Sequence, residues 1–262
     1  TDPQFYFPEG PEGRVEYLDR ARAIVAGMEA RLDEVFLTKP KIDLEVRAVE
    51  AYREKSAGKA FYRGGSPDGS RPGIFYANLA NMKDMPRFEL EALVYHEAIP
   101  GHHLQLAIQT ELEGLPAFRQ FGGVTAYSEG WGLYSEFLGI EAGIYETPYD
   151  NFGRLSYEMW RACRLVVDTG MHTMGWSRQQ AVDYMMENTA LSEHNVNTEI
   201  DRYISWPAQA LSYKIGEIKI KALRKKAEKA LGQHFDVRKF HRAVLENGSV
   251  PLFILEQHMH FI

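Results

Sequence analysis

The 262-residue sequence contains a single cysteine, Cys163, so no disulfide bond can form within the chain. It also lacks any uninterrupted run of about 18 apolar residues, the length that a membrane-spanning helix requires. Basic side chains are outnumbered, with 30 Lys and Arg against 36 Asp and Glu, which gives a formal charge of −6. This charge repels a phosphate backbone. We therefore expect no membrane-spanning segment and no nucleic-acid partner.

No low-complexity segment, fixed-period repeat or interdomain linker interrupts the sequence. Apolar residues make up 45% of it and charged residues 25%, which is typical of a globular domain. We expect one folded region over residues 1–262, in which Cys163 is a buried apolar residue rather than a nucleophile. The chain begins Thr-Asp-Pro without a signal segment, so we expect it to be processed, trimmed or cut from a longer protein.

The spacing of the apolar residues predicts a mainly α-helical, multi-helix protein. Residues 11–37 have helical periodicity, which ends before Pro40. Alternating apolar residues, a turn-rich stretch and an aromatic run then predict a small two- or three-stranded β-sheet within residues 41–80. From residue 124 to the C-terminus the pattern is almost wholly helical. We expect about eight helices, with the sheet placed before the helix that carries the chemistry.

The most informative segment is Tyr95–Leu104, which reads Tyr-His-Glu-Ala-Ile-Pro-Gly-His-His-Leu. A zinc hydrolase needs neutral imidazoles on the metal and a carboxylate near the bound water. The usual solution is His-Glu-x-x-His on a helix, where both histidines share one face. Here the position four residues after His96 is Pro100, so the segment departs from that motif.

Geometry decides whether these histidines can share a metal. Along a regular helix, His102 and His103 would lie roughly 9 to 10.5 Å from His96, whereas nitrogens that share a zinc ion are about 3.3 Å apart. Pro100 cannot donate a backbone hydrogen bond, and Gly101 allows unusual dihedral angles. We therefore predict that the helix leaves regular geometry here and brings a later histidine back toward His96.

These residues resemble a known family. The runs His96–Gln105 and Glu129–Tyr134 are similar to the signature of the bacterial domain of unknown function 885, and the resemblance extends over the whole chain. It implies a mainly helical, gluzincin-like zinc metallopeptidase, distantly similar to thimet-type oligopeptidases and Taq-type carboxypeptidases. Family members are longer, which implies that residues 1–262 are the C-terminal, metal-binding region and that a missing N-terminal half completes the cleft.

The resemblance also implies a set of site residues. Its distant relatives read His-Glu-x-Gly-His, and pairing their Gly-His with Gly101-His102 makes His102 the second ligand after His96. Glu97 is implied as the general base and Glu129 as the third ligand, around one Zn²⁺ per chain. The sequence leaves His103 open as an alternative ligand or a supporting group.

For each further candidate residue the sequence allows both a functional and a structural interpretation. Glu136 is either an acceptor for a ligand or a solvated acid. Transition-state hydrogen-bond donors and substrate-carboxylate binders are also needed. The candidate donors are Tyr213, Tyr203 and His172, and the candidate carboxylate binders are Arg202, Arg161 and Lys214; each also suits a core residue or a structural ion pair. The strand around Phe75–Asn78 either pairs with an extended peptide, with Asn78 gripping its backbone, or lies inside the sheet.

The sequence favours zinc-dependent hydrolysis of peptide bonds, with a zinc-activated water and a glutamate base. Dipeptidase, carboxypeptidase and oligopeptidase activities all remain open, as does a bacterial location that is periplasmic, exported or cytoplasmic. The alternative is a non-catalytic metal-binding or structural domain that needs its missing N-terminal half. A di-iron carboxylate bundle is excluded, because no glutamate stands three residues before any of the nine histidines.

Overall fold

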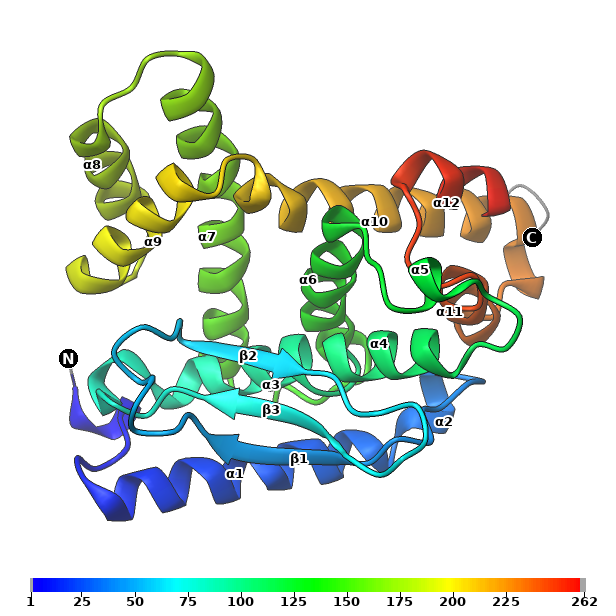
Figure 1. The fold of residues 1–262 in the computed structure, drawn as a ribbon, viewed down its shortest axis with the longest axis horizontal. Coiled ribbons are helices and arrows are strands. Elements are labelled where there is room, and N and C mark those ends of the chain that lie inside the picture. The colour runs from blue at the N-terminus through cyan, green and yellow to red at the C-terminus, as the bar shows by residue number, and fades with distance from the viewer. Residues whose placement is uncertain (1, 260–262) are drawn as a thin grey trace.

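The computed structural model describes residues 2–259. Helices make up most of this part of the chain and a small three-stranded sheet lies among its first 80 residues, which confirms the predicted fold class (Figure 1). The helices are α1 (Pro11–Glu29), α2 (Leu32–Val35), α3 (Leu90–Glu97), α4 (His102–Glu111), α5 (Ala117–Gln120), α6 (Thr125–Glu141), α7 (Pro148–Thr173), α8 (Arg178–Asn188), α9 (Glu193–Ser205), α10 (Ser212–Leu231), α11 (Val237–Leu245) and α12 (Leu252–His258). The short 3₁₀ helices are η1 (Pro3–Phe5), η2 (Met82–Asp84), η3 (Arg87–Glu89), η4 (Gln209–Leu211) and η5 (Gly232–His234).

The sheet has the strand order β1-β3-β2, formed by β1 (Leu44–Ala48), β2 (Ala60–Arg63) and β3 (Gly73–Ala77). Strand β3 is parallel to β1 and antiparallel to β2. Every residue of β3 is buried, as its aromatic and branched composition favours. Because β3 is central, both of its edges are already paired, so Phe75–Asn78 lies inside the sheet and the alternative in which it pairs with a substrate strand is wrong. Within the described part of the chain, the outer strands β1 and β2 each have one unpaired edge.

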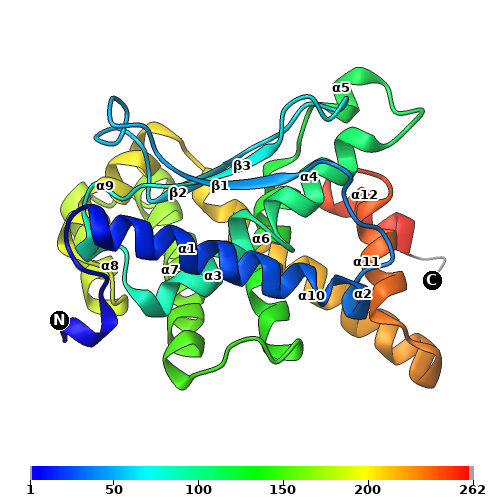
Figure 2. The same ribbon diagram turned by 90° about the horizontal axis from the view of Figure 1, so that it is seen from below.

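Helix α1 packs against β1 and α3 (Figure 2). Tyr17, Ala21, Val25 and Met28 are buried at intervals of three or four residues, as an amphipathic helix requires. The helix ends at Glu29, so the prediction of one continuous helix over residues 11–37 is wrong. The short helix α2 follows and directs its apolar residues into the core instead.

Helices α6 and α10 make extensive contact and approach each other closely where two glycines meet. A Cβ atom at Gly130 would lie 2.4 Å from the Cα atom of Gly216, so neither position leaves room for a side chain. Long helix α7 also contacts α10 (Figure 1). It carries Cys163, which is buried as predicted. None of the described helices is both long enough and apolar enough to cross a membrane.

Candidate metal centre

The helix that begins after the sheet is interrupted where the sequence predicts. Helix α3 stops and α4 starts again after the turn 98–101. A Cβ atom at Gly101 would lie 1.9 Å from the carbonyl oxygen of His96, so the tight turn requires glycine there. The indole Nε1 of Trp131 donates a hydrogen bond of 2.9 Å to the carbonyl oxygen of Pro100 and anchors the turn to α6. Local sequence and a long-range contact thus act together to reposition α4.

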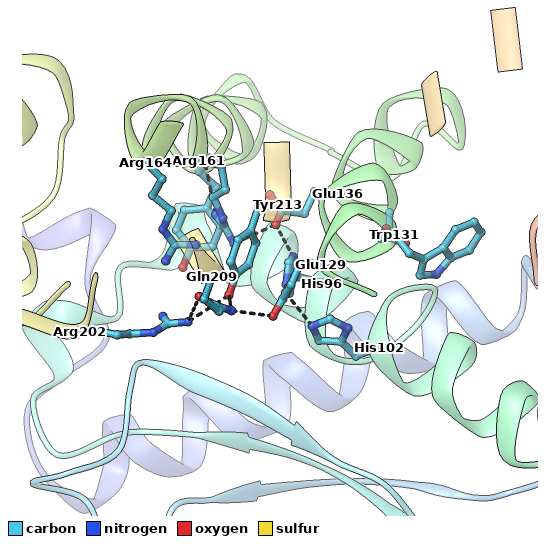
Figure 3. Close-up of polar contacts among 12 residues, drawn as sticks. His96, His102, Glu129, Trp131, Glu136, Arg161, Arg164, Arg202, Gln209 and Tyr213 are labelled. Carbon is cyan, nitrogen blue, oxygen red and sulfur yellow. Dashed lines mark hydrogen bonds and ion pairs between the residues drawn. The ribbon is translucent and has the colours of Figure 1, made fainter. Parts of the chain in front are cut away.

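This turn brings three side chains from α3, α4 and α6 together (Figure 3). Oε2 of Glu129 lies 3.4 Å from Nε2 of His96 and 3.3 Å from Nε2 of His102, and the three atoms lie within 4.8 Å of one another. Zinc bonds of 2.0–2.1 Å at tetrahedral angles give ligand atoms about 3.3 Å apart. Although these contacts are close, Oε2 of Glu129 is buried and has no hydrogen-bond partner of good geometry among residues 2–259. These three atoms are therefore placed where they could all bind one metal ion.

The other nitrogen of His96 is held from behind by Glu136. Nδ1 of His96 donates to Oε1 of Glu136 at 2.7 Å, and Nη2 of Arg161 lies 3.1 Å from the same oxygen. Glu136 is only 1% exposed, so the solvated-acid interpretation is wrong, and its carboxylate accepts a hydrogen bond from His96. A carboxylate that accepts from the second nitrogen fixes the tautomer of a metal-binding histidine and makes it a stronger ligand.

The charges around His96 favour a cation. Burial opposes protonation of this imidazole, but the nearby carboxylates of Glu129 and Glu136 outweigh burial and raise its pKa to about 9 in the metal-free protein. Burial likewise opposes ionisation of Glu129, yet the two histidines hold the pKa of its carboxyl well below the usual range. In both cases the site stabilises the positive charge that a metal ion would supply.

The second glycine of the Glu-Gly-Trp-Gly run on α6, Gly132, leaves space for the imidazole of His96. A Cβ atom at Gly132 would lie 2.6 Å from Cε1 of His96 and 2.9 Å from its Nε2. Any larger residue would push the imidazole away from Glu129. This run therefore supplies the candidate ligand Glu129, the indole that anchors the turn and the space for the candidate ligand His96.

The three side chains open onto a cleft of about 530 Å³, within the usual range for a ligand-binding site. Glu97 lines it beside His96. Strand β2 forms one wall, while the start of α6 and the segment from the end of α9 to the start of α10 form the others. Among the lining residues are Ala60, Phe61, Tyr62, His96, Glu97, His102, Ser128, Glu129, Arg202, Trp206, Gln209 and Tyr213.

His103 points away from the cluster formed by His96, His102 and Glu129. Its Nδ1 is hydrogen-bonded to the hydroxyl of Tyr62 at 3.0 Å, and the residue is only 1% exposed. Burial lowers the pKa of this imidazole to about 4, so it is neutral at pH 7. The alternative in which His103 is a ligand is therefore wrong. Its imidazole instead connects α4 to β2 through Tyr62.

Tyr213 reaches the cleft, as the sequence predicts. Its ring stacks on the imidazole of His96 with 5.9 Å between centroids. Burial, followed by the charge of Glu129, raises the pKa of its phenol, so the hydroxyl keeps its proton at neutral pH. Nη2 of Arg202 and Nε2 of Gln209 each donate to this hydroxyl at 3.3 Å.

Sequence reasoning did not identify Gln209 as a site residue. Its Nε2 also donates to Oε1 of Glu129 at 3.3 Å, so one amide positions both a candidate ligand and the Tyr213 hydroxyl (Figure 3). The only available signal was its place in the family-like run that contains Tyr213.

Two other predicted donors lie outside the cleft. The hydroxyl of Tyr203 accepts from Nε of Arg164 at 2.7 Å and from Nε1 of Trp160 at 3.1 Å. His172 donates from Nε2 to the carbonyl oxygen of Tyr203. Neither residue lines the cleft, so the prediction that they contact substrate is wrong. Their hydrogen bonds instead hold α7 against α9.

Two predicted substrate-binding residues are likewise used within the fold. Nζ of Lys214 lies 2.7 Å from both Glu158 and Glu217, which makes it a structural ion pair. The amide nitrogen of Asn78 donates to two carbonyl oxygens in the loop between β1 and β2, at 2.9 and 3.0 Å. Neither side chain lines the cleft. Of the predicted carboxylate binders, Arg202 lines it, and Arg161 lies immediately behind it.

Two solved structures have the same fold. A protein from Colwellia psychrerythraea, provisionally described as a lipoprotein, is 42% identical and superposes with a TM-score of 0.97 over 99% of this chain. A second protein of provisional lipoprotein description and unknown function, from Shewanella oneidensis, is 20% identical with a TM-score of 0.79 over 98% of the chain and resembles it in fold. The chain spans 45% and 51% of these two proteins, about half their length.

A comparison with curated proteins found no match. The family model described as "Bacterial protein of unknown function (DUF885)" matches residues 1–259, nearly the whole chain. The 42% identity to the Colwellia protein over nearly all of this chain agrees with that match. The chain therefore belongs to the DUF885 family of bacterial proteins.

Proposed function

We propose that this protein is a zinc-dependent peptide hydrolase of the gluzincin type. The observation that carries the proposal is the convergence of His96, His102 and Glu129: Oε2 of Glu129 lies 3.4 and 3.3 Å from the two Nε2 atoms, and all three ligand atoms lie within 4.8 Å of one another. A catalytic zinc site commonly uses three protein ligands and leaves one position open for water. Glu97 stands beside this cluster in the cleft, where a general base is needed.

Each group has a defined role in peptide hydrolysis. A bound zinc ion would lower the pKa of water and polarise the scissile carbonyl. Glu97 takes the proton from the attacking water and delivers it to the leaving amine. Tyr213 donates its hydroxyl hydrogen to the oxygen on which negative charge develops, because burial keeps the phenol protonated and Gln209 and Arg202 fix its position.

The position of strand β2 supports the proposal that the substrate is a peptide. Its residues Ala60, Phe61 and Tyr62 line the cleft, and its outer edge is unpaired in the described part of the chain. An extended peptide that adds to this edge would satisfy the free backbone groups and pass across the candidate metal ligands. The role first assigned to β3 thus falls to β2.

The proposal also concerns the part of the parent protein that lies outside residues 1–262. Because the chain spans about half the length of its solved relatives, we propose that it is the C-terminal catalytic region and that an N-terminal half completes the cleft. The provisional lipoprotein description of these relatives favours an exported, cell-envelope location over a cytoplasmic one.

The deciding experiment uses the full-length protein loaded with zinc and a peptide library analysed by mass spectrometry. Glu97→Gln should keep zinc, because Glu97 is not a ligand, and should lower turnover by at least about a hundredfold. Glu113→Gln, which changes an exposed glutamate after α4, is the matched control and should keep full turnover. Unchanged turnover in Glu97→Gln would contradict the mechanism. Stoichiometric zinc without cleavage of any peptide would favour the non-catalytic metal-binding alternative.

A further inference from the structure

A second, smaller cavity of about 70 Å³ adjoins the cleft on the side of α7. The two spaces share His96, Glu97, Arg202 and Tyr213 as lining residues. Beyond Tyr213 the smaller cavity is lined by the guanidinium-bearing residues Arg161, Arg164 and Arg202, and we call it the arginine pocket. Its volume suits one small polar group rather than a side chain with several ring atoms.

Two of these arginines are deeply buried and incompletely bonded. Arg161 is 4% exposed and Arg164 2% exposed. Among the described residues, Nε of Arg161 and Nη1 of Arg164 find no hydrogen-bond partner. A buried, charged nitrogen without a partner is costly, and natural proteins retain such groups mainly at functional sites.

The charges of the arginine pocket do not balance. Arg161 pairs with Glu136 at 3.1 Å, while Arg164 and Arg202 both approach Glu199, at 2.8 and 3.5 Å. Three guanidinium groups therefore share two carboxylates, and one positive charge is left over.

The remaining charged groups do not remove this surplus. Lys59, a fourth cation of the lining, is paired with Glu89. Zinc, with two positive charges, would be balanced by Glu97 and Glu129. The uncompensated charge matches one carboxylate, and a planar guanidinium is the side chain best shaped to bind one.

We infer that the arginine pocket binds the C-terminal carboxylate of a peptide substrate, so that the protein removes residues from the C-terminal end. This inference rests on the proposed peptidase function and names its substrate class. Internal peptide segments and C-terminal amides lack the charge that the pocket requires, and are correspondingly poor ligands.

The position of the pocket sets how far the carboxylate lies from the bond that is cut. The ring of Tyr213 separates the two sites: it stacks on His96, and the guanidinium carbon of Arg164 lies 4.3 Å from its centroid on the arginine side. An extended residue spans about 3.3–3.6 Å. The His96 imidazole and the Arg164 guanidinium are at most about 10 Å apart across this ring. Because the substrate carbonyl and carboxylate each need a contact distance at their own end, we expect one or two residues between them, which predicts release of a single amino acid or a dipeptide.

The test compares peptides that differ only at the C-terminus. A tetrapeptide pool of mixed sequence is made once with free carboxylates and once with C-terminal amides, and its binding to full-length, zinc-loaded Glu97→Gln is measured by calorimetry. A charge-assisted contact of this kind should make the acids bind about 10- to 100-fold more tightly than the amides. Equal binding of acids and amides would overturn the inference.

Variants then locate the binding groups. Arg202→Gln is chosen because the Arg202 side chain is 34% exposed, so its replacement opens no closed cavity. In this variant the acid-to-amide affinity ratio should fall at least about fivefold, and Arg202→Lys should restore part of it. Arg178→Gln removes an exposed arginine on α8 and should leave the ratio unchanged. An unchanged ratio in Arg202→Gln would contradict the assignment of that residue to the pocket.

Cleavage by the wild-type protein separates this inference from the proposed function. Preferred cleavage of the acids, one or two residues from the C-terminus, supports both. Equal cleavage of acids and amides at internal bonds overturns the arginine pocket and leaves the peptidase standing. Tighter binding of the acids without any cleavage supports the pocket and overturns the peptidase.

Discussion

Nδ1 of His96 and Oε1 of Glu136 meet at 2.7 Å between α3 and α6, and this contact directs the other imidazole nitrogen toward His102 and Glu129. The same Glu136 oxygen lies 3.1 Å from Arg161, which lines the arginine pocket. One buried carboxylate thus links the orientation of a candidate metal ligand to the group proposed to recognise the substrate carboxylate.

Replacing Glu136 should weaken metal binding without removing a ligand. Glu136→Gln keeps the shape of the side chain but loses the charge that favours a strongly basic His96 imidazole, so zinc affinity should fall about 10- to 100-fold. Competition with a chromogenic chelator measures this change. Glu141→Gln, in the last turn of the same helix and 39% exposed, should keep the wild-type affinity. Equal affinities of the two variants would rule out the supporting role of Glu136.

The proposed ligands predict which side chains zinc binding requires. His96→Ala and Glu129→Ala each remove one of three converging ligands, and both should lose stoichiometric zinc after dialysis. His103→Ala should retain one zinc per chain, because its imidazole bonds to Tyr62 instead, although loss of that buried contact should lower the melting temperature. Mass spectrometry under native conditions reads the stoichiometry. Zinc retained at full stoichiometry in both ligand variants would refute the assignment.

Zinc affinity should rise with pH. The carboxylates beside His96 raise its pKa to about 9 in the metal-free protein, so at pH 7 the imidazole carries a proton that zinc must displace. The apparent affinity should therefore increase through pH 6–8 and level off near pH 9. Calorimetry in two buffers of different ionisation enthalpy should detect proton release on binding at pH 7. A pH-independent affinity over this range would contradict the protonated state of His96.

Adding one methyl group at Gly132 should disturb the site. In Gly132→Ala the new carbon would lie 2.6 Å from the His96 ring, so the imidazole must move and zinc affinity should fall at least about tenfold. Overpacking of this kind typically also costs about 1–3 kcal/mol of stability. Gly27→Ala in α1 meets no atom within 4 Å and should stabilise the protein slightly, by up to about 1 kcal/mol. Chelator competition and thermal unfolding report the two effects, and a Gly132→Ala variant with wild-type zinc affinity would contradict the proposed crowding.

Local sequence was sufficient for the features whose cause is local. The mainly helical fold follows from apolar spacing, and the break before His102 follows from the Pro100-Gly101 pair, whose backbone cannot continue a regular helix. His96, His102 and Glu129 were singled out as ligand candidates by the resemblance of their segments to the DUF885 signature, a pattern of residue types along the chain. The predictions of the helical fold and of the helix break are confirmed, because residue type and neighbours constrain the backbone directly.

Packing between distant segments decided the rest. Nothing near His103 in the sequence indicates that Tyr62 would bind it, and the choice of β2 rather than β3 as the free edge depends on strand order. The same holds for Tyr203 on α9, whose hydroxyl is hydrogen-bonded to Arg164 on α7 and therefore does not face the cleft. Which face of a helix or edge of a strand meets the cleft depends on long-range contacts, which periodicity alone does not specify.

The arginine pocket shows the division most clearly. The sequence by itself determined that Arg161 and Arg164 lie three residues apart on one helix, a spacing equally suited to a solvated ion-pair face. Only the tertiary structure buried both of them beside Tyr213, left Glu199 to be shared by Arg164 and Arg202, and assigned Glu136 to His96 as well. The physical reason is that charge balance and desolvation belong to the three-dimensional neighbourhood of a group, and that neighbourhood is assembled from helices far apart in the chain.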